Sequence, residues 1–285
     1  MSRRVLDFGE LVKFSHTIFL FPFALAAVVL AAREEPLRLE TFLWVVVALV
    51  AARSAAMIMN RLADLPFDAQ NPRTAGRSLV TGQVSPRLAW LWLLLTVAVF
   101  VSAAGMLNPL CLWLSPLALA WVLGYSYTKR FTSLCHLWLG VATALAPLGA
   151  WVAVTGTLDW RLLVLGGAVA AWVAGFDIIY ACQDVEFDRG QGLLSLPACR
   201  GVGGGLRISR LLHALAAAGF LALAPLFGLG GLYLGGVAAA ACILCAEHVL
   251  VARRAANIPL AFFTLNGVVS ILLFLCLLAD TLWQG

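Results

Sequence analysis

The chain has 285 residues, of which 62% are hydrophobic and only 12% are charged, and its formal net charge is +5. Soluble domains carry roughly 25% charged residues, so this composition excludes a soluble globular domain and indicates an integral membrane protein. A helix crosses a bilayer with about 20 apolar residues, and we expect one domain, residues 1–285, that forms a single bundle of spans. Residues 1–11 contain arginines but lack the cleavage site of a signal peptide, so we expect nothing to be removed.

Long apolar runs, separated by charged residues and proline, predict the membrane-spanning helices. No run alternates with the period of two that indicates a strand, and helices satisfy their own backbone groups in lipid. The expected fold class is therefore an all-α polytopic membrane protein with about nine transmembrane helices. In chain order the predicted spans are 12–32, 40–62, 86–106, 109–124, 134–154, 160–182, 207–226, 228–250 and 259–281.

Basic residues are distributed unequally between the two faces of this predicted bundle. We assume that the loops after the second, fourth, sixth and eighth spans share the side of the N-terminus. Of the 19 Lys and Arg residues, only Arg33, Arg38 and Arg161 then lie on the opposite side. The positive-inside rule makes the basic side cytoplasmic. We therefore expect a protein of the bacterial cytoplasmic membrane whose basic and acidic loops face the cytoplasm.

Several polar or small residues in the spans have ordinary structural interpretations. The seven cysteines are odd in number and lie mostly in apolar runs, which does not favour a disulfide framework. Cys242 and Cys245 form a CxxC without a second pair, so helix packing is favoured over a metal site. The glycine-rich residues 201–205 do not follow a strand, which predicts a flexible loop and not a phosphate cradle. Glu247 and His248 lie one to two turns before Arg253 and Arg254, and we expect local pairing there at the membrane interface.

The first acidic segment closes the second predicted span. Asn60, Asp64 and Asp68 are spaced i, i+4, i+8, which places them on one face of a helix. Pro66 is expected to interrupt regular helix before Asp68. Amide and carboxylate oxygens are hard ligands that suit Mg²⁺, and this spacing therefore predicts a metal-binding face.

The second acidic segment closes the sixth predicted span. Asp177, Tyr180, Asp184 and Asp188 step by three, four and four residues and again share a face. Carboxylates at the edge of hydrocarbon are costly, and several that face one pocket repel each other unless cations lie between them. Since both segments lie on one predicted side, we expect Mg²⁺ that holds a pyrophosphate whose tail lies in the bilayer. For either segment considered alone, the alternative interpretation is a solvated helix end with ordinary carboxylates.

Basic side chains are predicted on the same side. Arg73 and Arg77 follow the first acidic segment, and Lys129 and Arg130 follow the fourth span. Such groups bind phosphate oxygens and stabilise the charge of a departing pyrophosphate. Topological signalling and attraction to anionic lipid remain the alternative for any one of them.

Together these segments resemble the UbiA superfamily of intramembrane aromatic prenyltransferases. Residues 60–77 resemble its first signature, N-D-x-x-D-x-x-x-D followed by R-T-x-x-R. Residues 177–188 resemble its second, D-x-x-Y-x-x-x-D-x-x-x-D, and residues 125–130 resemble the Y-x-x-x-K loop between them. Arg61 departs from the pattern, because many members have Asp there. The general likeness is nearest to the 4-hydroxybenzoate polyprenyltransferase branch.

The resemblance implies a Mg²⁺-dependent transferase. A polyprenyl pyrophosphate would ionise to an allylic cation in a dry pocket, and an aromatic ring carbon would attack that cation. The implied metal ligands are Asn60, Asp64, Asp68, Asp177, Asp184 and Asp188. The implied pyrophosphate contacts are Arg73, Arg77, Tyr125, Lys129 and Arg130. The implied catalytic residues are Asp64, Asp68, Lys129, Asp184 and Asp188.

The aromatic acceptor is left open by the sequence. One candidate is 4-hydroxybenzoate, in ubiquinone synthesis, and the other is a dihydroxynaphthoate, in menaquinone synthesis. Either carboxylate would want a basic partner, for which His16, His136, Arg53 and Arg61 are candidates. An ion-coupled transporter is the alternative outside enzymes, but it predicts carboxylates scattered at mid-span depth. The expected partners are polyprenyl pyrophosphate, the aromatic acceptor and the lipid bilayer, with no nucleic acid.

Overall fold

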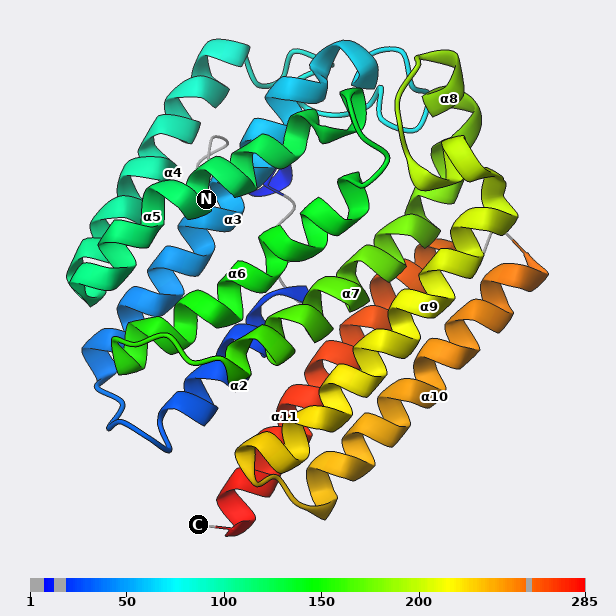
Figure 1. Ribbon diagram of the computed structural model, residues 1–285. Helices are drawn as coiled ribbons and strands as arrows, with labels where there is room; N and C mark the ends of the chain where they lie inside the picture. The colour runs from blue at the N-terminus through cyan, green and yellow to red at the C-terminus, as the bar shows by residue number, and fades with distance from the viewer. Residues whose placement is uncertain (1–7, 13–18, 255–257, 285) are drawn as a thin grey trace.

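The computed structural model describes residues 8–12, 19–254 and 258–284 (Figure 1). The regular structure of these residues is entirely helical. In chain order the elements are α2 (Phe21–Ala31), α3 (Leu39–Asp68), α4 (Pro86–Leu107), α5 (Pro109–Gly124), η2 (Tyr125–Arg130), α6 (Cys135–Thr155), α7 (Arg161–Ala181), η3 (Cys182–Asp184), α8 (Val185–Gly190), α9 (Leu196–Phe227), α10 (Gly231–Arg253), η5 (Leu260–Leu265) and α11 (Asn266–Gln284). Of the short elements, η2 and η3 are 3₁₀-helices and η5 is a π-helix.

The predicted fold class is confirmed. Eight helical segments in the described part of the chain are long and apolar enough to cross a membrane. Helix α2 is apolar as well but has 11 residues, and residues 13–18 of the first predicted span lie outside the described residues. The other eight predicted spans each overlap one of the eight long segments.

Polar caps followed by proline fix the start of three helices. The side chains of Ser85, Asn108 and Ser195 each accept a hydrogen bond from the backbone N–H three residues further on. A proline then occupies the first or second position of α4, α5 and α9. Such a cap supplies a partner to an N–H that the helix leaves unpaired, and proline fits because its position needs no donor. The Ser195 cap therefore starts α9 at Leu196, after the short α8 that carries Asp188.

Two expectations about helix ends were wrong. Pro66 does not interrupt α3, which continues to Asp68. Because this proline lies in the last turn, its ring removes one backbone hydrogen bond close to a helix end where pairing is incomplete anyway. Residues 201–205 are not a flexible loop but lie inside α9, with a kink at Gly201, whose φ is +74°. The seventh span therefore starts at Leu196, well before the predicted residue 207.

Small residues allow α7 and α9 to lie side by side in the core. Gly219 approaches Ala168 so closely that an added Cβ would overlap it, and a Cβ on Gly205 would lie 3.4 Å from the Ile178 side chain. Close backbone approach at small residues is the usual means of helix packing in membranes. Helix α7 is consequently buried along its length, and it carries the second acidic segment out of a rigid core.

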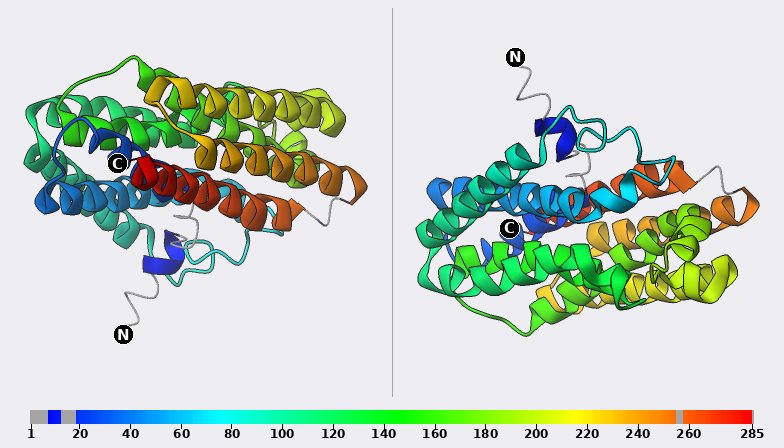
Figure 2. Two further views of the ribbon diagram at one scale, coloured as in Figure 1. Left: turned by 90° about the horizontal axis from the view of Figure 1, so that it is seen from below. Right: turned by 90° about the horizontal axis from the view of Figure 1, so that it is seen from above.

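The bundle places both acidic segments at one end. Figure 1 shows residues 69–85, η2, α8 and the start of α9 at this end, whereas the α2–α3, α6–α7 and α9–α10 connections lie at the other. In both views of Figure 2, α4 and α5 lie on one side of the bundle and α10 on the other. Arg53, which the charge count assigned to the basic side, lies in the middle of α3.

Candidate active site

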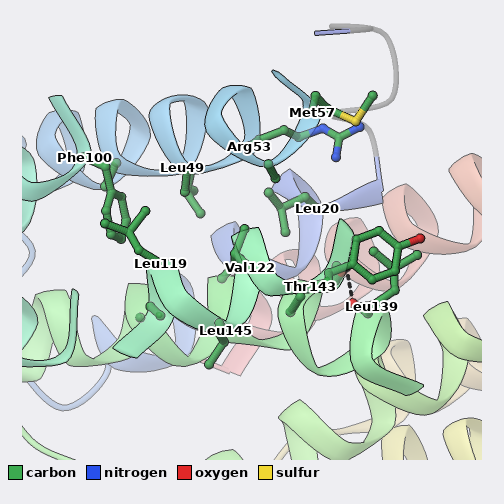
Figure 3. Close-up of a pocket in the computed structure, with 18 of the residues that line it drawn as sticks. Leu20, Leu49, Arg53, Met57, Phe100, Leu119, Val122, Leu139, Thr143 and Leu145 are labelled. Carbon is green, nitrogen blue, oxygen red and sulfur yellow. Dashed lines mark hydrogen bonds between the residues drawn. The ribbon is translucent and has the colours of Figure 1, made fainter. Parts of the chain in front are cut away.

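An apolar cavity of about 370 Å³ lies between α3, α4, α5, α6 and α7. It reaches from Asp177 and Tyr180, at the acidic end of the bundle, to Leu107 and Val152, near the opposite ends of α4 and α6. Leu49, Phe100, Leu119 and other apolar side chains form most of the wall (Figure 3). The cavity thus offers one polar end and a long hydrocarbon-like interior.

Arg53 is a cation within this apolar wall. Figure 3 places its side chain between Leu49 and Met57 on α3, with Leu20 below it. Its Nε atom is buried and has no hydrogen-bond partner among the described residues. A buried guanidinium nitrogen without an acceptor is costly, so this position is suited to an anionic group of a ligand.

The last turns of α3 carry the first acidic segment. Asn60 Nδ2 donates to Asp64 Oδ2 at 2.8 Å, and the Asp68 carboxylate pairs with Arg77. Thr74 donates to the Asp68 carbonyl at 3.1 Å. Because α3 stays helical to its end, the three predicted ligands lie on consecutive turns of one face.

The loop after α3 binds the second acidic segment. Arg73 donates to the Asp184 carboxylate from Nε at 2.9 Å and from Nη2 at 2.5 Å, and Asn71 Nδ2 donates to it at 3.2 Å. Arg73 Nη1 also donates to the Tyr180 hydroxyl at 2.8 Å. Burial lowers the pKa of Arg73, but the Asp184 hydrogen bond and the nearby negative groups outweigh burial and raise this pKa. The guanidinium therefore stays charged.

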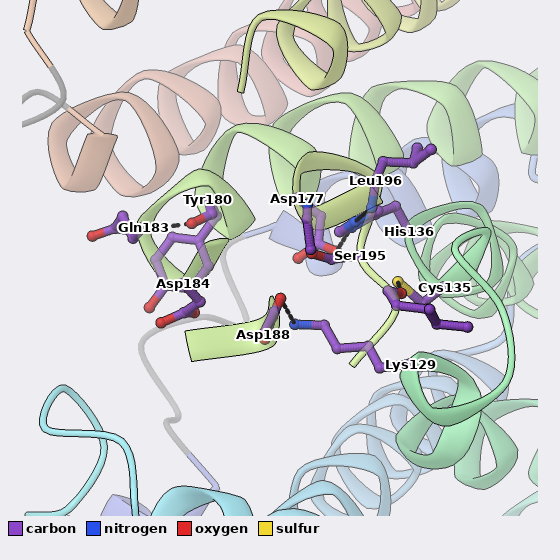
Figure 4. Close-up of polar contacts among 12 residues, drawn as sticks. Lys129, Cys135, His136, Asp177, Tyr180, Gln183, Asp184, Asp188, Ser195 and Leu196 are labelled. Atoms are coloured by element: carbon purple, nitrogen blue, oxygen red, sulfur yellow. Dashed lines mark hydrogen bonds and ion pairs between the residues drawn. The ribbon is translucent and has the colours of Figure 1, made fainter. Parts of the chain in front are cut away.

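The η2 segment supplies the third side of the site. Lys129 Nζ lies 3.6 Å from Asp188 Oδ2, and the Asp188 side chain is almost fully buried (Figure 4). The backbone carbonyl of Lys129 accepts from Leu194 N–H at 2.7 Å, which ties η2 to the segment before α9. Three charged segments far apart in the sequence thus meet in space, as the topology predicts.

Asp177 lines the cavity and is held from behind by a histidine. His136 Nδ1 lies 2.6 Å from Asp177 Oδ2, and His136 Nε2 accepts from Leu196 N–H at 3.3 Å (Figure 4). Since Nε2 is an acceptor, the ring proton lies on Nδ1 and is donated to Asp177. His136 is fully buried with both ring nitrogens engaged.

Comparison with known proteins identifies the family. Residues 20–279 match the model of the UbiA prenyltransferase family. The chain belongs to this family. It is 30% identical to a 4-hydroxybenzoate octaprenyltransferase of Hydrogenovibrio crunogenus over 91% of this chain and 90% of that protein. It is 32% identical to the enzyme of the same name from Azotobacter vinelandii, over 88% and 85% of the two chains. This chain is therefore a prenyltransferase, a transferase embedded in a membrane.

Solved structures of the UbiA family share the fold. A UbiA homologue from Aeropyrum pernix K1, in its apo form, superposes with a TM-score of 0.81 at 35% identity, covering 94% of this chain and 98% of that chain. A UbiA homologue from Archaeoglobus fulgidus bound to GPP and Mg²⁺ gives a TM-score of 0.71 at 19% identity over 96% and 99% of the chains. At 19% identity, the similarity to the Archaeoglobus fulgidus structure shows a shared fold.

In this structure, three of the predicted metal ligands form ion pairs with basic side chains. Among the described residues, no three His, Cys, Asp or Glu side chains are arranged to hold a metal ion. Asp68, Asp184 and Asp188 each pair with a basic side chain instead. The donor set still fits Mg²⁺ chemically, because it consists of carboxylate and amide oxygens and because the buried Asp188 Oδ2 has no hydrogen-bond partner in the described part.

Two predicted site residues have further structural contacts. Arg130 Nη2 donates to the Ala63 carbonyl at 2.6 Å, and its guanidinium lies over the Phe67 and Tyr127 rings. This contact secures the end of α3 and leaves Lys129 as the cation of η2 that faces an acid. Tyr125 contributes to the cavity wall. The roles assigned to these residues stay predictions.

Some functional groups were missed or assigned wrongly from the sequence. Asn71, a contact of Asp184, was not predicted, although its amide and its place beside Asp68 were a usable signal. Since both ring nitrogens of His136 are engaged, it is unavailable to an acceptor carboxylate, and His16 lies outside the described residues. The expected interface pairing of Glu247 was wrong, because its side chain is fully buried and accepts a hydrogen bond from Asn266.

Proposed function

We propose that this UbiA-family enzyme transfers a polyprenyl group from polyprenyl pyrophosphate to a ring carbon of an aromatic acid of the 4-hydroxybenzoate type. The observation that carries the proposal is Arg53, a cation in the wall of an apolar cavity, with an Nε atom that finds no protein acceptor. A carboxylate on an otherwise apolar aromatic ring supplies the missing partner. The curated relatives are named 4-hydroxybenzoate octaprenyltransferases, which supports this acceptor class.

The polar end of the cavity suits the pyrophosphate. Arg73, Arg77 and Lys129 all lie there, each beside a carboxylate, so phosphate oxygens would meet three cations from two loops. The archaeal homologue whose structure holds GPP and Mg²⁺ supports this class of donor. The polyprenyl tail would then occupy the apolar part between α3 and α6.

Mg²⁺ would be held by the predicted oxygen ligands. Its positive charge would stabilise the departing pyrophosphate. The ligands proposed for it are Asn60, Asp64, Asp68, Asp177, Asp184 and Asp188.

The side chains of this protein account for the other requirements of the reaction. The C–O bond of the donor breaks, and Lys129, Arg73 and Arg77 neutralise the pyrophosphate that leaves. The apolar wall keeps water from the allylic cation. Arg53 holds the acceptor carboxylate, so that the ring lies against the cation. A C–C bond forms, and the attacked ring carbon loses its proton.

We propose that the site opens to the cytoplasm. The acidic end of the bundle also carries most basic residues, whereas Arg33, Arg38 and Arg161 lie toward the opposite end. The positive-inside rule supports this orientation.

A product assay tests the proposed function. Membranes that contain the protein receive geranyl pyrophosphate, Mg²⁺ and either 4-hydroxybenzoate or a dihydroxynaphthoate, and products are read by mass spectrometry. We expect a prenylated benzoate, no product with EDTA, and recovery when Mg²⁺ is restored, because the pyrophosphate leaves as a multiply charged anion. A prenylated naphthoate would change the acceptor, and no product from either would refute the proposed function.

Asp159→Asn is expected to leave activity unchanged. Asp159 lies at the opposite end of the bundle, where its carboxylate pairs with Arg161. The hydrogen bond from Arg161 lowers the pKa of Asp159. Ion pairs close to solvent contribute about 0–1 kcal/mol to stability, and this pair is partly exposed. Initial rates and melting temperature, compared with those of the unmodified protein, check this. A large loss of activity would show that carboxylate changes far from the site act indirectly.

A further inference from the structure

A buried polar cluster lies behind the active site, among α7, α10 and α11. Trp172, Glu247 and Asn266 are all fully buried in it. Trp172 Nε1 donates to Asn266 Oδ1 at 2.8 Å, and Asn266 Nδ2 donates to Glu247 Oε1 at 2.9 Å. No step of the proposed reaction uses these groups.

Asn266 also holds the backbone of the preceding turn. Its Nδ2 donates to the carbonyl of Ala261 at 3.0 Å. Ala261 belongs to η5, the π-helical turn Leu260–Leu265, and regular α-helix resumes at Asn266. A π-helical turn is rare, and single turns of this kind inside α-helices occur frequently at functional sites. The side chain of Asn266 is therefore placed where the π-helical turn changes into α-helix.

The π-helical turn carries Phe262 into the cavity wall. The Phe262 ring lies 4.2 Å from the Tyr180 ring, centroid to centroid, and 5.4 Å from the Phe176 ring. The Tyr180 hydroxyl in turn accepts from Arg73, whose guanidinium lies over the Tyr180 ring at 5.1 Å. Asn266 is thus linked to Arg73 through its hydrogen bond to Ala261, the adjacent residue Phe262, and the contacts of Phe262 with Tyr180 and of Tyr180 with Arg73.

The composition of the cluster does not favour a role in stability alone. Burial of an acid inside a membrane bundle is costly, and well-packed apolar residues are often equally or more stable at such positions. Glu247 Oε2 has no hydrogen-bond partner in the described part of the chain, and His213 Nδ1 lies 3.8 Å from it. The cluster fixes the orientation of the Asn266 side chain, because Trp172 donates to its amide oxygen and Glu247 accepts from its amide nitrogen.

We propose that Asn266, oriented by Glu247 and Trp172, is a positioning residue for the pyrophosphate site. It sets the π-helical turn, the turn places Phe262 against Tyr180, and Tyr180 holds Arg73 in the direction of the phosphate oxygens. The inference rests on the proposed function in one respect, namely that Arg73 binds the pyrophosphate.

Binding measurements on purified, monodisperse protein test this inference without turnover. Titration calorimetry with geranyl thiopyrophosphate and Mg²⁺ gives the Kd of the donor, and titration with 4-hydroxybenzoate gives that of the acceptor. Asn266→Leu keeps the size of the side chain but removes all three hydrogen bonds. We expect the donor Kd to rise about tenfold, as for residues that orient a ligand-binding group, while the acceptor Kd stays within about twofold.

The double variant decides whether Asn266 acts through Phe262. Phe262→Ala should raise the donor Kd by itself. If Asn266 acts through this ring, Asn266→Leu combined with Phe262→Ala should be no worse than Phe262→Ala alone. If the increase in donor Kd of the double variant is the product of the increases in the two single variants, the proposal is overturned. An unchanged donor Kd in Asn266→Leu would overturn it as well.

Matched controls separate positioning from folding. Glu247→Gln keeps an oxygen acceptor for Asn266 and should retain the original donor Kd. Tyr233→Phe removes a buried hydrogen bond of 2.8 Å from α10 to the Phe220 carbonyl, away from the π-helical turn. It should lower thermal stability and leave both Kd values unchanged. If Asn266→Leu does not fold, Trp172→Phe, which removes one of the three bonds, is measured in its place with the same criteria.

Failure of this inference differs from failure of the proposed function. Unmodified protein that binds no geranyl thiopyrophosphate would refute the proposed donor. Unmodified protein that binds it, with an Asn266→Leu variant that binds equally well, would refute the positioning role alone.

Discussion

Asp184→Asn and Asp64→Asn are each expected to lower kcat/KM for the donor at least about 100-fold at a fixed Mg²⁺ concentration. Asparagine keeps the shape of each side chain but removes the negative charge that attracts Mg²⁺. Asp184 now accepts three hydrogen bonds, from Asn71 and Arg73. Asp64 accepts one from Asn60. Initial rates of product formation, measured over a Mg²⁺ titration, check the expectation.

The Mg²⁺ titration distinguishes a metal ligand from a mere partner of arginine. Loss of a metal ligand raises the Mg²⁺ concentration needed for half-maximal rate. Loss of an arginine partner instead frees Arg73 and changes the KM of the donor. Asp159→Asn, at the other end of the bundle, is the matched control for an Asp-to-Asn change. Unchanged rates and unchanged Mg²⁺ dependence in both active-site variants would contradict the proposed metal site.

The positions of the charged segments were predictable because topology and charge constrain them together. Alternating spans bring the segments after α3, α5 and α7 to one end, and opposite charges then favour the pairs Arg73–Asp184 and Lys129–Asp188. The hydrophobic runs also predicted the long helices, although the start of α9 was placed at residue 207 and lies at Leu196. Neither inference needed the packing of individual side chains.

Contacts set by tertiary packing were not predictable in the same way. Arg53 lies inside the predicted span 40–62 and was a candidate for the acceptor carboxylate, but the lack of a partner for its Nε among the described residues depends on which side chains of other helices surround it in the cavity wall. Helical structure at residues 201–205 depends on the fit of Gly205 against Pro197 and Ile178, which local propensity does not include. The partner of Glu247 is Asn266, in another helix, whereas a pattern based on neighbours in sequence favours local pairing one to two turns away, near Arg253 and Arg254.

Arg53→Met is expected to raise the KM for 4-hydroxybenzoate about 10- to 100-fold, the range that follows from the loss of a charged hydrogen bond. Methionine keeps most of the length of the side chain and suits the apolar wall, so the cavity should keep its form. The KM for geranyl pyrophosphate should change little, because Arg53 lies in the apolar wall and not among the Arg73, Arg77 and Lys129 pairs. Steady-state kinetics with each substrate varied in turn provide the measurement.

A neutral acceptor sharpens this experiment. The unmodified enzyme should prefer 4-hydroxybenzoate to its methyl ester, because the ester leaves the guanidinium without a charged partner. Arg53→Met should lose that preference and accept the two compounds about equally. Arg33→Met is the matched control, since Arg33 donates to the Phe227 carbonyl at 2.8 Å at the opposite end of the bundle. A rise in the donor KM with an unchanged acceptor KM would place Arg53 at the pyrophosphate, whereas a lost preference for the acid assigns it to the acceptor carboxylate.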